Sequence, residues 1–73
     1  MTPHINPRHL TYQVRWSDED QEYVGTCREL PSLSHLDSTP TAALHGIIGV
    51  VGMATEDFTA EEWAALKTRA EVV

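Results

Sequence analysis

The sequence predicts one α+β domain: a three-stranded antiparallel sheet in the order β-β-β-α, with one helix packed on it and a second helix at the C-terminal end. Three observations predict this fold. Two runs of alternating residues flank an acidic turn, as in a β-hairpin. A short third run, residues 33–36, follows the Leu30-Pro31 corner, where proline cannot continue a strand ladder. Helix-start signals then come at Thr39 and Thr59, and a short fourth strand remains open.

Residues 1–9 are polar and hold two prolines, so we expect a flexible N-terminal arm. The β-β-β-α core then covers residues 10–54. Its first run has apolar side chains at every second position, which is typical of a half-buried strand. These apolar residues are Tyr12, Val14 and Trp16. Residues 17–22 form the turn, whose adjacent acidic side chains favour solvent.

The second run covers residues 23–28. Gly25 lies in its interior, where a glycine indicates a close backbone approach or a bulge. Cys27 shares a face with Gly25, and we interpret it as a small buried hydrophobic residue rather than a nucleophile. Arg28 and Glu29 follow at an end of the sheet that we expect to be exposed, and we predict no role for them.

The first helix is expected to begin at Pro40, with Thr39 as its N-cap, and to run to about Ala54. Proline suits the first helical position because its missing N–H would have no partner there. Between residues 42 and 54 only His45 is strongly polar, and a helix that is apolar all round is usually covered all round. One face packs on the sheet. The second helix or a second subunit covers the other face. We favour the subunit, because a short chain has few secondary-structure elements with which to enclose a helix.

Three glycines recur at every third position of this helix: Gly46, Gly49 and Gly52. Each costs about 1 kcal/mol relative to alanine in a helix interior, so the helix depends on tertiary or quaternary packing. Three interpretations are open. The glycine row permits another helix to approach closely, it is drift in a tolerated helix, or the helix ends early near Gly52. A Gly49→Ala variant with unchanged assembly and stability would remove the first interpretation.

The second helix is predicted over residues 58–71 by a complete start signal. Thr59 and Glu62 have the spacing of a capping box, and Phe58 and Trp63 have that of a hydrophobic staple. The apolar side chains that recur three and four apart are Trp63, Leu66, Ala70 and Val73. The candidates for an oligomer interface are Gly46, Gly49, Val50, Met53, Trp63 and Leu66.

Chain length also favours self-association. With 73 residues, the chain forms one small domain, and such a domain buries only about 60% of its unfolded surface. Small domains often gain stability from disulfides, a metal or oligomerisation. One cysteine excludes an internal disulfide, and no residues show zinc-ligand spacing. We therefore expect no cofactor, and a homodimer or a tetramer.

The net charge of −6 and the pI near 4.9 argue against nucleic-acid binding, which needs clustered Lys and Arg. The charge serves ordinary solubility or complements a basic partner. No signal peptide is visible. The most apolar stretch, residues 42–54, is shorter than the roughly 17–25 residues that span a bilayer. We expect a cytoplasmic protein with no membrane contact.

The acids of the turn, Asp18, Glu19, Asp20 and Glu22, raise the question of a metal or catalytic site. Carboxylates bind divalent ions in nucleases, but they converge there from separate elements, whereas these cluster on one turn. A solvated turn is therefore strongly favoured, with an acidic patch for a basic partner as the functional alternative. The histidines, interpreted as surface or edge residues, are His4, His9, His35 and His45. We predict no catalytic, metal-binding or cofactor-binding residue.

The ordered set W-S, E-Y-V, E-L-P-S-L-S, S-T-P and A-L within residues 10–53 resembles the HicB-like antitoxin family, whose domain has a partial RNase H-like fold. The resemblance implies a non-catalytic protein that forms dimers or tetramers. It also implies that the protein binds and neutralises a small HicA-like mRNA-cleaving toxin by covering the basic surface of that toxin. The candidate partner contacts are Trp16, Asp18, Glu19, Asp20 and Tyr23, with the aromatic residues as possible anchors.

The chain departs from the family after the first helix. Family members usually continue into a ribbon-helix-helix or helix-turn-helix segment, which this sequence does not show, so we expect no direct DNA binding. The departure favours an alternative: a stand-alone oligomeric HicB-like interaction module without a toxin partner. A third hypothesis, a metal-dependent nuclease, requires magnesium-dependent RNA cleavage that Asp18→Asn abolishes.

Overall fold

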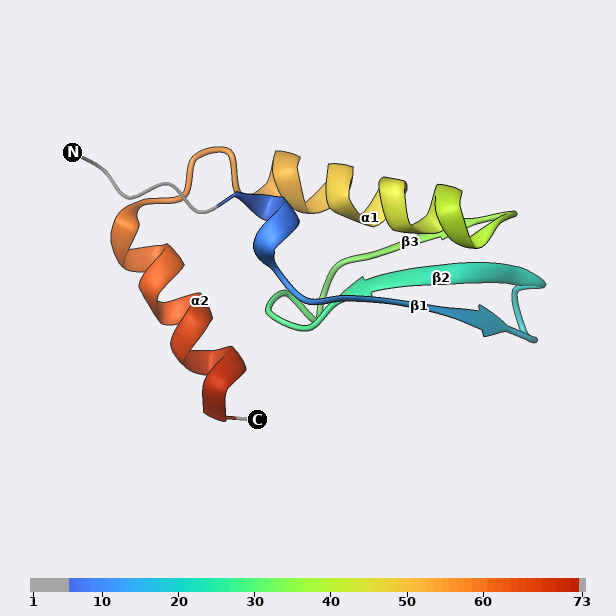
Figure 1. Cartoon of the computed structure of the whole chain (residues 1–73), viewed down its shortest axis with the longest axis horizontal. Coiled ribbons are helices and arrows are strands. Elements are labelled where there is room, and N and C mark those ends of the chain that lie inside the picture. Colours follow the sequence, from blue (N-terminus) through green and yellow to red (C-terminus); the bar gives the residue numbers. More distant parts are fainter. Residues whose placement is uncertain (1–5, 73) are drawn as a thin grey trace.

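The computed structural model describes residues 6–72, with side chains as far as Leu66. It has the predicted α+β fold, a three-stranded antiparallel sheet with two α-helices (Figure 1). The elements are η1 Pro7–His9, β1 Tyr12–Ser17, β2 Glu22–Cys27, β3 Ser34–Asp37, α1 Pro40–Ala54 and α2 Ala60–Val72. Residues 7–9 of the expected arm form the short 3-10 helix η1, and residues 1–5 lie outside the described part. The described residues form no fourth strand.

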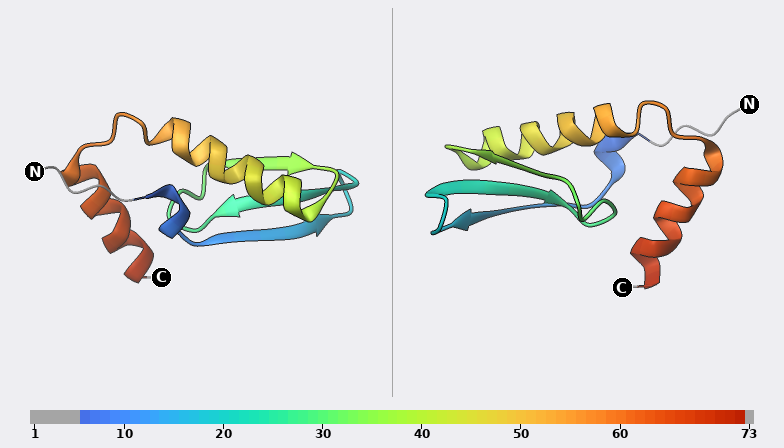
Figure 2. Two further views of the ribbon diagram at one scale, coloured as in Figure 1. Left: turned by 45° about the horizontal axis from the view of Figure 1, so that its top comes forward. Right: turned by 180° about the vertical axis from the view of Figure 1, so that it is seen from behind.

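The sheet has the order β1-β2-β3, so β1 and β3 are its edges. Gly25 lies on the central strand, opposite Val14 on β1 and His35 on β3. α1 runs along one face of this sheet. The views of Figure 2 show that no element of the described chain covers the other face. The molecule therefore has two layers, with one sheet face open.

The core lies between α1 and the sheet. Cys27 is 1% exposed, and Ile47 and Val51 are 0% exposed, which confirms Cys27 as a packing residue. The close approach predicted at Gly25 is also confirmed. A Cβ atom there would lie 2.6 Å from the carbonyl oxygen of Ala43 and 2.9 Å from Cγ2 of Ile47. The helix therefore rests directly on the backbone of β2.

Both helix starts follow their sequence signals. At α1, the Thr39 hydroxyl accepts a hydrogen bond from the N–H of Ala42 at 3.1 Å. At α2, the N–H of Thr59 donates to Oε1 of Glu62 at 3.1 Å, and the N–H of Glu62 donates back to Oγ1 of Thr59 at 3.2 Å. The rings of Phe58 and Trp63 stack edge-on with centroids 5.2 Å apart. The capping box and the hydrophobic staple are thus confirmed.

α2 does not cover the outer face of α1. It follows beyond the C-terminal end of α1 and runs away from α1, beyond the end of the sheet (Figure 1). Met53, on the outer face of α1, is 78% exposed. Of the predicted apolar stripe on α2, Trp63 and Leu66 are buried within the chain, whereas Ala70 and Val73 lie outside the residues whose side chains are described. A second subunit as the cover of α1 stays a prediction.

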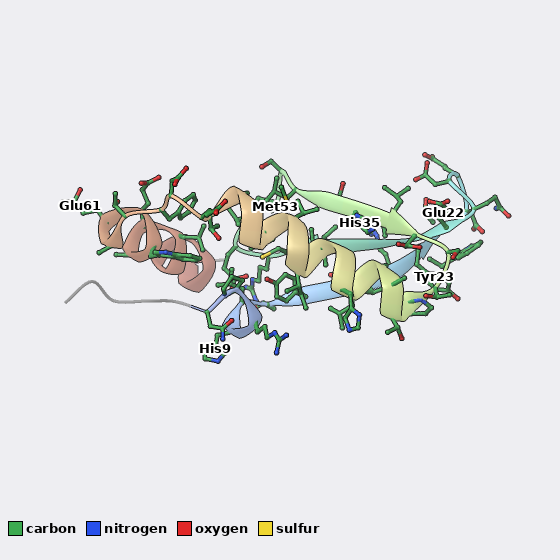
Figure 3. All side chains as sticks on the ribbon, turned by 90° about the horizontal axis from the view of Figure 1, so that it is seen from above. His9, Glu22, Tyr23, His35, Met53 and Glu61 are labelled. Atoms are coloured by element: carbon green, nitrogen blue, oxygen red, sulfur yellow. The ribbon has the colours of Figure 1, made fainter. Side chains whose placement is uncertain are left out.

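The glycines of α1 differ in their surroundings. A Cβ atom on Gly46 would lie 2.0 Å from Cδ2 of His35, whereas Gly49 and Gly52 have no atom within 4 Å of that position. The imidazole of His35 thus occupies the space next to Gly46, and its Nε2 lies 3.2 Å from Oδ2 of Asp37. His35 is an edge-strand residue, as expected, but it is half-buried between β3 and α1 (Figure 3).

We expect Gly49→Ala to raise the free energy of unfolding by about 1 kcal/mol, because it gains helix propensity and displaces no atom. Gly46→Ala gains the same propensity but displaces His35, so its stability should be unchanged or lower. In a His35→Ala background, Gly46→Ala should stabilise the chain as Gly49→Ala does. Urea denaturation of these variants measures the difference. Equal gains at both glycines with His35 present would contradict this packing.

Candidate protein-binding site

The hairpin end of the sheet carries an aromatic pair, of which Trp16 is exposed and Tyr23 is half-buried. Trp16 on β1 lies opposite Tyr23 on β2, and their rings meet edge-on with centroids 5.1 Å apart at 71°. Trp16 is 47% exposed. Figure 3 places Tyr23 and Glu22 at the end of the molecule opposite to Glu61 on α2. An aromatic pair of this kind offers a large, rigid apolar surface to a partner.

Local hydrogen bonds order the acidic turn beside this pair. Asp18 Oδ1 accepts a hydrogen bond from Trp16 Nε1 at 2.8 Å. Oδ2 of Asp20 accepts one from the Ser17 hydroxyl at 3.0 Å. Gln21 has a φ of 54°, a left-handed backbone that is unusual outside glycine, and its side-chain amide donates to the carbonyl of Asp18 at 2.7 Å. The three carboxylates are therefore exposed, and that of Asp18 is held against Trp16.

The structure brings the predicted partner-binding residues together. Four of the five, all except Tyr23, line an open hollow of about 440 Å³, and Tyr23 packs against Trp16. The residues that line it are Arg15, Trp16, Ser17, Asp18, Glu19, Asp20 and Val24. The described residues include no group of three or more His, Cys, Asp or Glu side chains that could hold a metal ion. The hollow presents aromatic area and negative charge side by side, which suits a contact surface for a partner.

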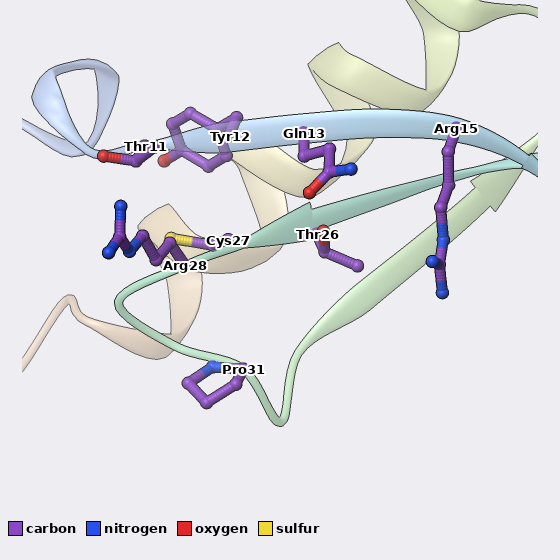
Figure 4. Close-up of a pocket in the computed structure, with 8 residues that line it drawn as sticks. All are labelled: Thr11, Tyr12, Gln13, Arg15, Thr26, Cys27, Arg28 and Pro31. Carbon is purple, nitrogen blue, oxygen red and sulfur yellow. The ribbon is translucent and has the colours of Figure 1, made fainter. Parts of the chain in front are cut away.

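A second hollow, of about 660 Å³, lies at the other end of the β1–β2 pair (Figure 4). Its lining residues are Thr11, Tyr12, Gln13, Arg15, Thr26, Cys27, Arg28 and Pro31. The thiol is the reactive group among them, but Cys27 is buried and burial raises its pKa. The thiolate that nucleophilic chemistry needs is therefore disfavoured. This hollow supplies polar contacts and no activated nucleophile.

Glu29, next to this hollow, is buried, so our prediction for it was wrong. We expected it at an exposed end of the sheet, but it is only 7% exposed. Its carboxylate accepts hydrogen bonds from the N–H of Thr11 at 2.9 Å and the Thr11 hydroxyl at 3.0 Å. Burial alone would raise its pKa, but the hydrogen bonds from Thr11, from its own backbone N–H and from the Cys27 thiol together outweigh burial, and the pKa lies below its usual value. Glu29 thus anchors the start of β1 to the end of β2.

Tyr12 belongs to the same buried corner. Burial, followed by the nearby Cys27 and Glu29, raises the pKa of Tyr12 to about 12. Its hydroxyl donates to the carbonyl of Pro7 and so ties η1 to β1. These residues hold the N-terminal segment against the sheet, and none of them was singled out from the sequence for this role.

The predicted oligomer-interface residues do not share one surface. The side-chain space of Gly46 is taken by His35. Trp63 and Leu66 are buried within the chain. Val50 is half-buried against the core, which leaves Gly49 and Met53 exposed. Self-association through these residues stays a prediction.

Comparisons with family models, curated proteins and solved structures found no match for this chain. Among the described residues, neither helix is long and apolar enough to cross a membrane. The class that the structure defines is a small two-layer α+β domain with an acidic, aromatic hairpin end.

Proposed function

We propose that the protein is a HicB-like antitoxin-type binding protein that acts in the cytoplasm and neutralises a small basic HicA-like mRNA-cleaving toxin by direct contact. The observation that carries the proposal is the exposed Trp16, which Asp18 fixes at an acidic hairpin end. Aromatic side chains are typical anchors of protein interfaces. Carboxylates around such an anchor attract a basic partner and fix its orientation.

The fold and the charge support this proposal. A three-stranded sheet with one helix across it is the arrangement that the resemblance implies. The net charge of −6 favours the encounter with a basic protein. All the acids of the candidate site lie on one turn and do not converge from separate elements, which favours binding over metal-assisted hydrolysis. In this mechanism the protein occupies the active surface of the toxin and makes or breaks no bond itself.

The test is titration of the purified protein against a small basic protein encoded next to its own gene, with inhibition of RNA cleavage as the second readout. Neutralising the turn by Asp18→Asn, Glu19→Gln and Asp20→Asn together should weaken binding roughly tenfold or more. The loss should shrink as salt rises, because salt screens exposed charges.

The matched control neutralises three exposed acids near the start of α2, by Glu56→Gln, Asp57→Asn and Glu61→Gln. It removes the same charge from the opposite end of the molecule and should leave binding nearly unchanged. Trp16→Ala should cost about 2 kcal/mol of binding energy if Trp16 is an anchor. The proposal fails if no basic neighbour binds, or if both charge-neutralised proteins bind equally well.

A second candidate function is a stand-alone oligomeric interaction module with no toxin. The outer face of α1 favours it, because Met53 is 78% exposed there and Gly49 has open space around it. A purified chain that forms a defined oligomer and binds no basic protein would favour this module over the antitoxin.

A further inference from the structure

The two edges of the sheet are protected to different degrees. Unpaired edge strands invite pairing with another chain, and proteins usually blunt them with proline, bulges, charge or short length. β3 is short, Ser34–Asp37, and carries Asp37. β1 is longer, Tyr12–Ser17, and pairs with β2 in an unbroken register without a bulge. It contains no proline and one charged residue, Arg15, so β1 is the edge that is open to pairing.

The backbone groups that face outward from β1 follow from its pairing. The N–H of Arg28 donates to the carbonyl of Thr11 at 2.9 Å, so the backbone of Thr11 faces β2. Backbone groups alternate sides along an antiparallel strand. Gln13, Arg15 and Ser17 therefore also face β2. The N–H and carbonyl groups that point away from the sheet belong to Tyr12, Val14 and Trp16.

One register lets β1 pair with a second copy of itself through all of these groups. A two-fold axis at Val14 sets Tyr12 opposite Trp16 of the second copy and Gln13 opposite Arg15. An axis at Arg15 gives the same overlap but sets two arginines opposite each other, which is destabilising. An axis at Gln13 overlaps only residues 12–14. Of these three registers, only the one centred on Val14 pairs all the outward backbone groups of β1 without setting like charges opposite each other.

The same register also turns acidic groups of one copy toward basic groups of the other. Because the two copies are antiparallel, the acidic turn of each copy points toward the end of β1 at which η1 lies in the other. Arg8 and His9 form the exposed basic end of η1, and Glu19 and Asp20 are exposed on the turn. The two-fold axis repeats this arrangement at both ends of β1. A chain of net charge −6 can therefore self-associate along this edge by charge complementarity.

We propose that β1 is a homodimer interface, at which two copies pair antiparallel about Val14 and form one continuous six-stranded sheet. The occupant of this edge is a second copy of the chain. Trp16, 47% exposed in one copy, then gains Tyr12 of the other as a cross-strand neighbour. The inference does not rest on the proposed function, because the purified chain alone forms the dimer.

The test uses a matched pair of substitutions at Gln13, whose side chain is exposed on the open sheet face. Gln13→Glu faces Arg15 of the second copy twice per dimer and should lower the dimer dissociation constant roughly fivefold. Gln13→Lys faces the same arginine with like charge and should raise it by a similar factor. Sedimentation velocity over a concentration series measures both constants. Urea denaturation of dilute protein verifies that each variant folds as the unchanged chain does.

Cysteine cross-linking tests the register between the two β1 strands independently. Gln13→Cys combined with Arg15→Cys should form disulfides between copies, because the paired Cα atoms would lie about 4.5 Å apart. Arg15→Cys alone should not. A chain that is monomeric at every concentration overturns the proposal. So does a dimer that is indifferent to residue 13, or one that Gly49→Glu disrupts instead, which would place the contact on α1.

Discussion

Gly25→Ala is expected to lower the free energy of unfolding by about 2–3 kcal/mol. The new Cβ would lie 2.6 Å from the carbonyl oxygen of Ala43 and 2.9 Å from Cγ2 of Ile47. Both atoms belong to the buried face of α1, and one is backbone, so rotation of a side chain cannot relieve the contact. The helix must lift from β2, which loosens the packing around Ile47 and Val51.

Urea denaturation followed by tryptophan fluorescence measures this loss. Gly49→Ala is the matched control, because it adds the same methyl group on the same α1–sheet unit where no atom lies within 4 Å. The two variants should therefore shift the denaturation midpoint in opposite directions. A Gly25→Ala protein as stable as the unchanged chain would mean that α1 is not seated on β2 at this point.

The features that sequence reasoning predicted well are local ones. The start of α1 depends on Thr39 and Ala42, and the start of α2 on residues 58–63. The residues of the candidate site fall within a single hairpin, so predicting the hairpin was enough to bring Trp16, the acids and Tyr23 together. Periodicity within a strand or helix needs no knowledge of distant partners.

The features that sequence reasoning missed depend on distant partners. A glutamate at the end of a strand indicates solvent exposure, but Glu29 is buried and accepts hydrogen bonds from Thr11, which lies just before β1. The three glycines of α1 have equivalent spacing in the sequence, but His35 occupies the side-chain space of Gly46 alone. Even the third strand begins one residue later than predicted, because the N–H of Leu33 donates to the carbonyl of Leu30 within the corner. Only the tertiary fold sets the contacts of Glu29 and Gly46, whereas the later start of the third strand follows from this local turn.

Glu29→Gln is the second prediction with a large effect, and we expect it to lower stability at neutral pH by about 1–2 kcal/mol. The carboxylate accepts hydrogen bonds from both the N–H and the hydroxyl of Thr11. An amide keeps one accepting oxygen and loses the charge that strengthens these bonds. The anchor between the start of β1 and the end of β2 would therefore weaken, and η1 and Tyr12 depend on that corner.

The stabilisation by the Glu29 carboxylate should disappear at low pH. The pKa of Glu29 is lowered in the folded chain from an ordinary value of 4.5. Its contribution to stability is therefore fully present above pH 4.5 and is lost as the pH falls through the lower folded pKa. The stability difference between the unchanged chain and Glu29→Gln should be constant near neutral pH and shrink below pH 4.5. Asp37, whose pKa is also lowered, is common to both proteins and cancels in this difference.

Urea denaturation at a series of pH values measures the difference directly. Glu56→Gln removes one negative charge from an exposed position and controls for the change in net charge. A buried anchor requires that Glu29→Gln lose stability at neutral pH while Glu56→Gln does not. If both variants matched the unchanged chain at every pH, the Glu29–Thr11 contact would contribute nothing to holding β1 on the sheet. The edge that β1 offers to a second copy would then be held in place by the ladder with β2 and by packing against α1.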